Sequence, residues 1–377
     1  MNKASTEPDI RTTITTSTEV APFWNRIQKS LFEGLEDTIG ASLAMYSKLI
    51  YVLNTIRIES FVPSRAGLPG RPSARRALAR AFLVKAELDI PTTTDLITML
   101  KTDSCLRRLV GFERLGDIPH ESNFSRAFAY FARIGLSNSV HQACVRKHYG
   151  EAVIIDVYRD STAVEARERP AERPAKVKEP KKKPGRKRGV PPKPKVEKRQ
   201  ERQLRQSWEE AVAELPCQCD MGAKMNSKGH NQYWHGYKLH VDVTDFQTPL
   251  SAVTTSASTH DSQVAIPLMK MTSDRVLAVC YQIMDKGYVG NPIIAAAQTL
   301  GQKTIIAPKM KRGKVKAEPM DPATAHRYKK RSGVERFFAE LKDNHGGRHV
   351  RVRTQEKVHL HLMLGLLCIF AHSLLRM

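Results

Sequence analysis

The sequence is poor in acidic residues and in aromatic residues. Of 377 residues, 38 are aspartate or glutamate and 61 are lysine or arginine, so the formal net charge is +23 and the pI is about 9.9. Aromatic residues make up 7% of the chain. A surface this basic needs an anionic partner or counter-ions, and nucleic acid is the commonest such partner. A membrane surface is the weaker alternative.

Cysteine is also scarce, with six in the chain. Only Cys217 and Cys219 stand close together, and their one-residue gap, without a second pair, does not fit a zinc knuckle. We therefore expect no structural zinc. We expect these cysteines to be reduced thiols of a cytoplasmic protein.

Long apolar runs are missing as well. The first twenty residues hold no apolar signal region. The longest apolar run, residues 360–375, is interrupted by His361 and His372 and is shorter than a membrane span requires. We expect this run to form a core helix, and we expect no membrane partner.

Composition divides the chain into three segments. Residues 1–20 are polar and threonine-rich, which predicts disorder. Residues 21–150 carry short helical patterns with basic faces, which favour a DNA-binding unit of the helix-turn-helix kind. A small helical bundle used for dimerisation is the alternative. In residues 151–377, β-branched strand patterns alternate with helical ones, which predicts a mixed α/β domain.

A basic, proline-rich insertion spans residues 167–206. Its stretch 171–205 holds 15 lysines and arginines against 4 glutamates, a net charge of +11. Recurrent proline and charge predict an extended, disordered arm. Such an arm can contact DNA phosphates without reading sequence, and a solvated linker is the alternative. The cations assigned to phosphate contact are Lys181, Lys182, Lys183, Arg186, Lys187 and Arg188.

Residues 326–347 have the pattern of an amphipathic helix with a narrow polar row. At 100° per residue, four polar residues lie within about 60° of one another. A simpler interpretation is an i, i+4 ion pair on a solvated face. Gly333 leaves open a helix that begins there, with the residues before it on a separate approach. The four residues are Tyr328, Arg331, Glu335 and Lys342.

Three carboxylates stand where metal ligands are expected. Asp160 lies in the first predicted strand, Asp285 ends a later strand, and Glu335 lies on the late helix. If the strands are neighbours and the helix crosses them, the three converge. Carboxylate oxygens suit Mg²⁺, with Mn²⁺ as a substitute. Alternatively, Asp285 caps the following turn, and Asp156 competes with Asp160 on the same strand face.

The spacing Tyr328-x2-Arg331-x3-Glu335-x6-Lys342 resembles the Y-R-E-K signature of bacterial insertion-sequence transposases of the DDE type. The segments RDSTAVEARERP and MDKGYVG resemble the family's segments around its first and second catalytic aspartates. The resemblance covers about residues 150–375. It implies a ribonuclease H-like mixed-sheet core, preceded by an all-α N-terminal domain.

The resemblance also implies the chemistry. Asp160, Asp285 and Glu335 would hold two Mg²⁺ ions for cleavage at the element ends and for strand transfer into target DNA. Only 50 residues separate Asp285 from Glu335, too few for the large β insertion of some relatives. A stand-alone ribonuclease H-like nuclease and a catalytically silent DNA-binding protein derived from a transposase are the alternatives.

The implied partner is double-stranded DNA, both the terminal inverted repeats and the target, bound by a homodimer in a synaptic complex at the nucleoid. Tyr328, Arg331 and Lys342 would contact phosphates near the cut. His260 and Asp261 would lie near the site.

Overall fold

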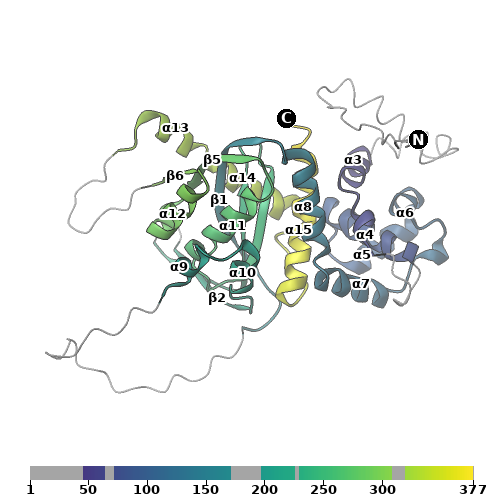
Figure 1. Ribbon diagram of the computed structural model, residues 1–377. Helices are drawn as coiled ribbons and strands as arrows, with labels where there is room; N and C mark the ends of the chain where they lie inside the picture. Colours follow the sequence, from purple (N-terminus) through teal and green to yellow (C-terminus); the bar gives the residue numbers. More distant parts are fainter. Residues whose placement is uncertain (1–45, 64–71, 171–196, 226–228, 308–318, 377) are drawn as a thin grey trace, which may run out of the picture.

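The computed structural model consists of a helical unit and a sheet-based unit, with the last helix of the chain between them (Figure 1). The predicted disorder of residues 1–20 and the six cations assigned in the basic arm lie outside the described residues. The structure describes residues 46–63, 72–170, 197–225, 229–307 and 319–376.

The helical unit packs around aromatic side chains. The ring of Phe82 meets those of Phe124, Phe128 and Phe131 edge to face, a geometry that adds stability beyond area burial. This confirms that the N-terminal region is helical. Its elements are α3 (Ser47–Ile56), η1 (Ile58–Phe61), α4 (Pro72–Glu87), α5 (Thr93–Thr102), α6 (Ser104–Val110), η2 (Leu115–Asp117), α7 (Glu121–Arg133) and α8 (Leu136–Tyr149).

The second unit is a six-stranded mixed sheet. Its order is β2-β3-β1-β5-β6, and β4 pairs with the other edge of β3. β1 is antiparallel to β3 but parallel to β5, and β5 is parallel to β6. This confirms the predicted mixed α/β core. The strands are β1 (Val153–Glu165), β2 (Asp220–Met225), β3 (Asn231–Val243), β4 (Pro249–Ser256), β5 (Ala278–Met284) and β6 (Lys303–Ile306).

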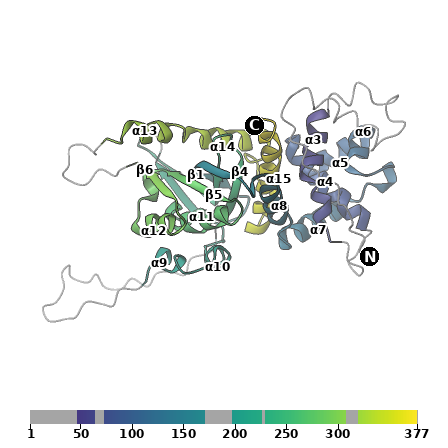
Figure 2. The same cartoon turned by 45° about the horizontal axis from the view of Figure 1, so that its top comes forward.

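Helices cover both faces of the sheet, as Figure 2 shows. One face carries α9 (Arg199–Gln203), α10 (Trp208–Ala213), η3 (Asp261–Gln263), α11 (Ala265–Ser273), η4 (Lys286–Tyr288) and α12 (Asn291–Thr299). The other carries α13 (Pro322–Lys329) and α14 (Ser332–Asn344). The prediction of disorder throughout 167–206 is wrong for residues 199–203, because the side chains of α9 bond to the core: Gln200 and Gln203 donate to the carbonyls of Ser262 and Gln263.

Alternation along β1 sends neighbouring residues to opposite faces. Arg159 points toward α11, where it is fully buried and forms a bidentate ion pair with Asp242 at 2.7 and 2.6 Å. It also donates to Gln282, and Thr272 donates to Asp242. Because a buried ion pair is stable only when its remaining groups are satisfied, this network holds β1, β3 and β5 in register beside Asp160.

α15 (Gln355–Ser373) joins the two units. One side, including Leu360, Leu364 and Phe370, packs in the core of the helical unit. The other, including Leu362 and Leu366, packs against the sheet and α14. A helix that is apolar all round is one that is buried all round, so the expected core helix is confirmed. Among the described residues, no helix is long and apolar enough to cross a membrane.

The predicted late helix is two helices. α13 ends at Lys329, and α14 begins at Ser332 with Arg331 as its N-cap residue. The prediction that Tyr328, Arg331, Glu335 and Lys342 share one continuous helical row is therefore wrong, and the alternative raised by Gly333 is close to what the structure shows.

Candidate active site

Asp160, within β1, and Asp285, directly after β5, lie side by side at the edge formed by the carboxyl end of β5. The parallel ladder pairs Arg159 on β1 with Met284 on β5, so the next residue of each strand is brought to the same place. Asp285 also fills the capping role that its position suggested, because its carboxylate accepts a hydrogen bond from the amide of Lys286 at 2.6 Å. The two interpretations of Asp285 are compatible.

Arg331 connects this edge to α14. Its guanidinium donates to Asp160 Oδ2 at 2.9 Å and to Glu335 Oε1 at 3.4 Å. The side chains of Asp160 and Arg331 are 24% and 20% exposed, whereas that of Glu335 is 63% exposed. Burial opposes the charge of Arg331, yet Asp160, Tyr328, Asp285 and Glu335 together raise its pKa. The positive charge of Arg331 is therefore stabilised by all three candidate carboxylates.

The three carboxylates do not form a closed ligand set. Across the described ranges, the groups of potential ligand atoms that lie within 4.8 Å of one another do not include Asp160, Asp285 and Glu335. The guanidinium of Arg331 bridges two of them instead. The donor chemistry still fits Mg²⁺ or Mn²⁺, since all three offer hard oxygen ligands at an accessible edge.

Asp160 is destabilised as an anion by its surroundings. Burial raises its pKa and the neighbouring Asp261 and Asp285 raise it further, while the amide of Ser161 and Arg331 oppose the shift. A cation at this edge would relieve the same repulsion. The charge distribution therefore favours binding of a positive group beside Asp160.

Asp261, Lys238 and His240 form a second polar group, and the charge of Asp261 acts on Asp160. The sequence indicated Asp261 only as a residue near the site. Lys238 Nζ lies 3.0 Å from Asp261 Oδ1, and His240 Nδ1 lies 3.9 Å from it. Burial opposes the charge of Asp261, but His240 and Lys238 lower its pKa. Sequence reasoning missed Lys238 and His240, although strand alternation places both on one face of β3.

Tyr288 was also missed. It is fully buried, and its hydroxyl has no hydrogen-bond partner among the residues that the structure describes. Burial raises its pKa, and the charges of Asp261 and Asp160 add to this effect. The MDKGY segment therefore contributes Asp285 at the surface and a phenol beneath it.

The three residues expected to contact phosphates near the cut, Tyr328, Arg331 and Lys342, lie in two separate parts of the structure. Tyr328 is half-buried on α13, with the guanidinium of Arg331 6.0 Å from its ring centre. Lys342 lies about 10 Å farther along α14 than Glu335, two helical turns away. Burial lowers the pKa of Lys342, and the charges of Lys224 on β2 and of Arg348 lower it further. The structure thus groups Tyr328 and Arg331 with the carboxylates and places Lys342 toward β2.

Asp156 has a structural partner of its own. It shares the face of Asp160, as alternation predicted, but is buried and pairs with Arg327 at 2.7 Å. Arg327 also stacks on Tyr281, with its guanidinium carbon 4.4 Å from the ring centre. These contacts hold α13 against β1 and β5, and Asp160 remains the candidate metal ligand of β1.

His260, expected near the site, is a capping residue, because its ring accepts a hydrogen bond from the amide of Ser262.

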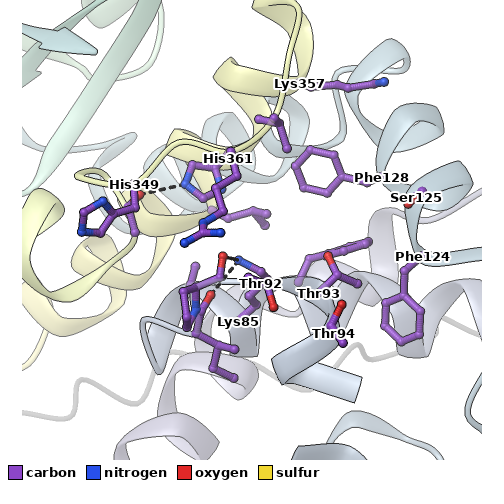
Figure 3. A pocket seen from close by; sticks show the side chains of 18 of the residues that line it. Lys85, Thr92, Thr93, Thr94, Phe124, Ser125, Phe128, His349, Lys357 and His361 are labelled. Carbon is purple, nitrogen blue, oxygen red and sulfur yellow. Dashed lines mark hydrogen bonds between the residues drawn. The ribbon is translucent and has the colours of Figure 1, made fainter. Parts of the chain in front are cut away.

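A basic cavity of about 490 Å³ lies between the helical unit and the segment that precedes α15. Figure 3 shows Phe124 and Phe128 on the side of the helical unit, with His349 and His361 across from them and Lys357 above Phe128. Its wall also includes Arg167, Arg351 and Arg353. Cations and aromatic faces together are the surface that single-stranded or distorted DNA favours. Sequence reasoning did not single out this surface.

Residues 192–371 match a family model described as Transposase DDE domain. The match includes Asp285 and Glu335 and begins after β1, so Asp160 precedes it. No curated protein matches the chain significantly. The mixed sheet with helices on both faces agrees with the ribonuclease H-like core that such a domain contains.

Proposed function

Residues 192–371 belong to the transposase DDE domain family, and on this basis we propose that the protein cleaves DNA at the ends of a mobile element and joins the freed ends to target DNA. The observation that carries the proposal is the register of β1 and β5. In this register Asp160 lies beside Asp285, and Arg331 donates hydrogen bonds to Asp160 and Glu335, which supports the proposal.

Asp160, Asp285 and Glu335 would hold Mg²⁺, or Mn²⁺ in its place. Two such ions activate an attacking oxygen and stabilise the leaving oxygen of a phosphodiester. The exposed carboxylate of Glu335 sits on a separate helix, so small movements of α14 can bring it toward the strand pair. The first reaction uses water as the attacking group, and the second uses the 3′ hydroxyl that the first reaction frees.

Arg331 has two roles in this proposal. Without DNA it neutralises Asp160 and Glu335. With the carboxylates holding a metal ion, the Arg331 guanidinium would be free to bind a phosphate near the cut by two parallel hydrogen bonds. Tyr328 lies next to it and lines the same approach. Lys342 contacts phosphate two turns away, and the cations of the basic arm contact DNA farther from the cut.

The basic cavity between the helical unit and the segment that precedes α15, called the junction cavity below, offers a further surface for DNA contact. Arg351, Arg353 and Lys357 lie on one wall, and Arg351 and Arg353 are exposed. We assign these cations to phosphate contact, with DNA running from the carboxylates toward the helical unit. Element ends are paired by a homodimer, since joining both ends to one target requires two active sites held together.

One experiment tests the function. Purified full-length protein is incubated with DNA carrying the element's own ends and with target DNA, in Mg²⁺ or with chelator. Metal-dependent cleavage followed by joining supports the proposal. Cleavage without joining favours a nuclease, and binding without cleavage favours a silent DNA-binding protein. Either of these two results contradicts it.

A further inference from the structure

A second group of potential metal ligands lies far from the candidate active site. Glu87, His345 and His372 place their ligand atoms within 4.8 Å of one another. His372 Nε2 lies 2.8 and 3.0 Å from the two carboxylate oxygens of Glu87, and His345 Nδ1 lies 3.8 Å from Glu87 Oε2. The two imidazole rings stack, with centres 5.8 Å apart. Both rings therefore direct a nitrogen at one carboxylate.

The cluster is enclosed. The side chains of His345 and Glu87 are 6% and 7% exposed, and that of His372 is 16% exposed. A buried carboxylate is costly unless a cation or several hydrogen bonds compensate it. Glu340, which also acts on His345, is paired with Arg376 at 2.9 Å. That arginine is therefore already engaged.

Three helices end at this cluster. Glu87 is the last residue of α4, His345 is the C-cap residue of α14, and His372 lies in the last turn of α15. Each helix C-terminus carries a partial negative charge of about half an electron. Three such ends and a carboxylate create a site of concentrated negative potential. A bound cation is the simplest means of neutralising it.

Close packing brings α14 and α15 together here. A Cβ atom on Gly365 would lie 2.5 Å from the carbonyl oxygen of His345 and 2.9 Å from Leu341 Cδ1. Glycine at position 365 thus lets the end of α14 approach α15. Cys368, one turn before His372, is fully buried beside Glu87. His345 Nδ1 also lies 3.3 Å from the backbone carbonyl oxygen of Ala86, a contact that a bound metal ion would replace.

The geometry points to a structural zinc site in which Glu87 Oε, His345 Nδ1 and His372 Nε2 bind one Zn²⁺. Two imidazoles and a carboxylate form a common zinc ligand set. The ion would link α4 of the helical unit to α14 of the sheet-based unit and to α15 between them. The cysteine spacing that argued against zinc does not bear on this set, because its ligands come from three separate helices. Ala86 and Gly346, which are the chain neighbours of Glu87 and His345, lie in the wall of the nearby cavity.

Metal analysis of the full-length protein, purified without a histidine tag, tests the site. We expect about one zinc ion per chain, as for a structural site. The variants His372→Ala and Glu87→Gln should lose at least about nine-tenths of it, because each ligand is one of three. The matched control is His349→Ala, which removes an exposed histidine of the nearby cavity and should retain zinc.

A second measurement separates loss of the metal from loss of folding. Chelator-treated wild-type protein should unfold at a temperature lower by on the order of 5 °C. Zn²⁺ should restore the midpoint, and Mg²⁺ should not. The inference is overturned if wild-type protein neither contains nor takes up zinc, or if the two ligand variants bind as much as the control. It does not depend on DNA cleavage, so its failure leaves the proposed function standing.

Discussion

At the edge of the sheet, Asp160, Asp285 and Glu335 offer oxygen atoms only, whereas at the junction Glu87, His345 and His372 offer one carboxylate and two imidazoles. The edge is open, with Glu335 63% exposed, and a cationic side chain bridges its ligands. The junction cluster is enclosed, and its ligand atoms already lie within 4.8 Å of one another.

The difference follows from what each site has to do. A catalytic site must leave positions for substrate and water, so its ligands stay apart until metal and DNA arrive. A structural site gains from being complete and closed, since its binding energy adds to folding. Under the two proposals, the carboxylate site would select a hard metal ion and the site with two imidazoles would select zinc.

The largest expected effect separates the two sites by chemistry. Asp285→Asn should reduce cleavage and joining by about a thousandfold or more, roughly 4 kcal/mol of transition-state stabilisation. Its zinc content should stay unchanged. Glu209→Gln, on an exposed position of α10, is the control for removal of one negative charge. A variant at Asp285 that joins ends as well as the parent would refute the site assignment.

Acid should lower the stability of the packing between the helical unit, α15 and the sheet. The neutral rings of His359 and His361 on α15 have pKa values that burial lowers to about 4, and that of His141 on α8 falls to about 3. Their unfolded pKa is near 6.5, so the stability that they confer above that pH is lost as pH falls toward 4. The free energy of unfolding should drop by up to about 1.4 kcal/mol per histidine per pH unit.

Urea unfolding between pH 7 and 4 measures this drop, and His141→Gln supplies the comparison. His141 Nε2 donates to the carbonyl of Pro249, and its Nδ1 accepts from Arg275, which defines its tautomer. The variant should be less stable at pH 7 but should lose less stability on acidification. Equal slopes in the two proteins would contradict the assignment.

The basic arm should govern salt sensitivity without affecting either metal site. Residues 171–196 hold 11 lysines and arginines against 2 glutamates. Deleting them spares α9, and should lower the salt slope of DNA binding by about 0.9 for each phosphate that the arm neutralises in the intact protein. Zinc content and Mg²⁺-dependent cleavage at low salt should persist. An unchanged slope would show that the arm does not touch phosphate.

The smallest expected effect concerns the junction cavity. Replacing both Arg351 and Arg353 with alanine should lower the salt slope by about 2 and weaken binding to all DNA sequences alike. Arg348→Ala, which breaks an exposed ion pair with Asp343, is the control outside the cavity. Weakening confined to one DNA sequence would indicate that these arginines read bases rather than phosphates.

Much of the core could be predicted because its signals are local. β-branched residues around Asp160 and an apolar run before Asp285 predicted two strands. The observed parallel pairing brings Asp160, within β1, beside the end of β5, which Asp285 follows. The break between α13 and α14 was harder, since Tyr328 and Arg331 fit a continuous helical period. α9 was missed because the charge of the arm around it outweighed five residues of helix.

The sequence by itself determined the resemblance to a transposase DDE domain, the mixed α/β core and three candidate carboxylates, because strand alternation, charge and short motifs depend on near neighbours. Only the tertiary structure decided that Arg331 bridges Asp160 and Glu335, and that α15 is buried on both sides. It alone also brought Glu87 to His372, 285 residues away. That proximity depends on how three helix ends pack, which no local pattern records.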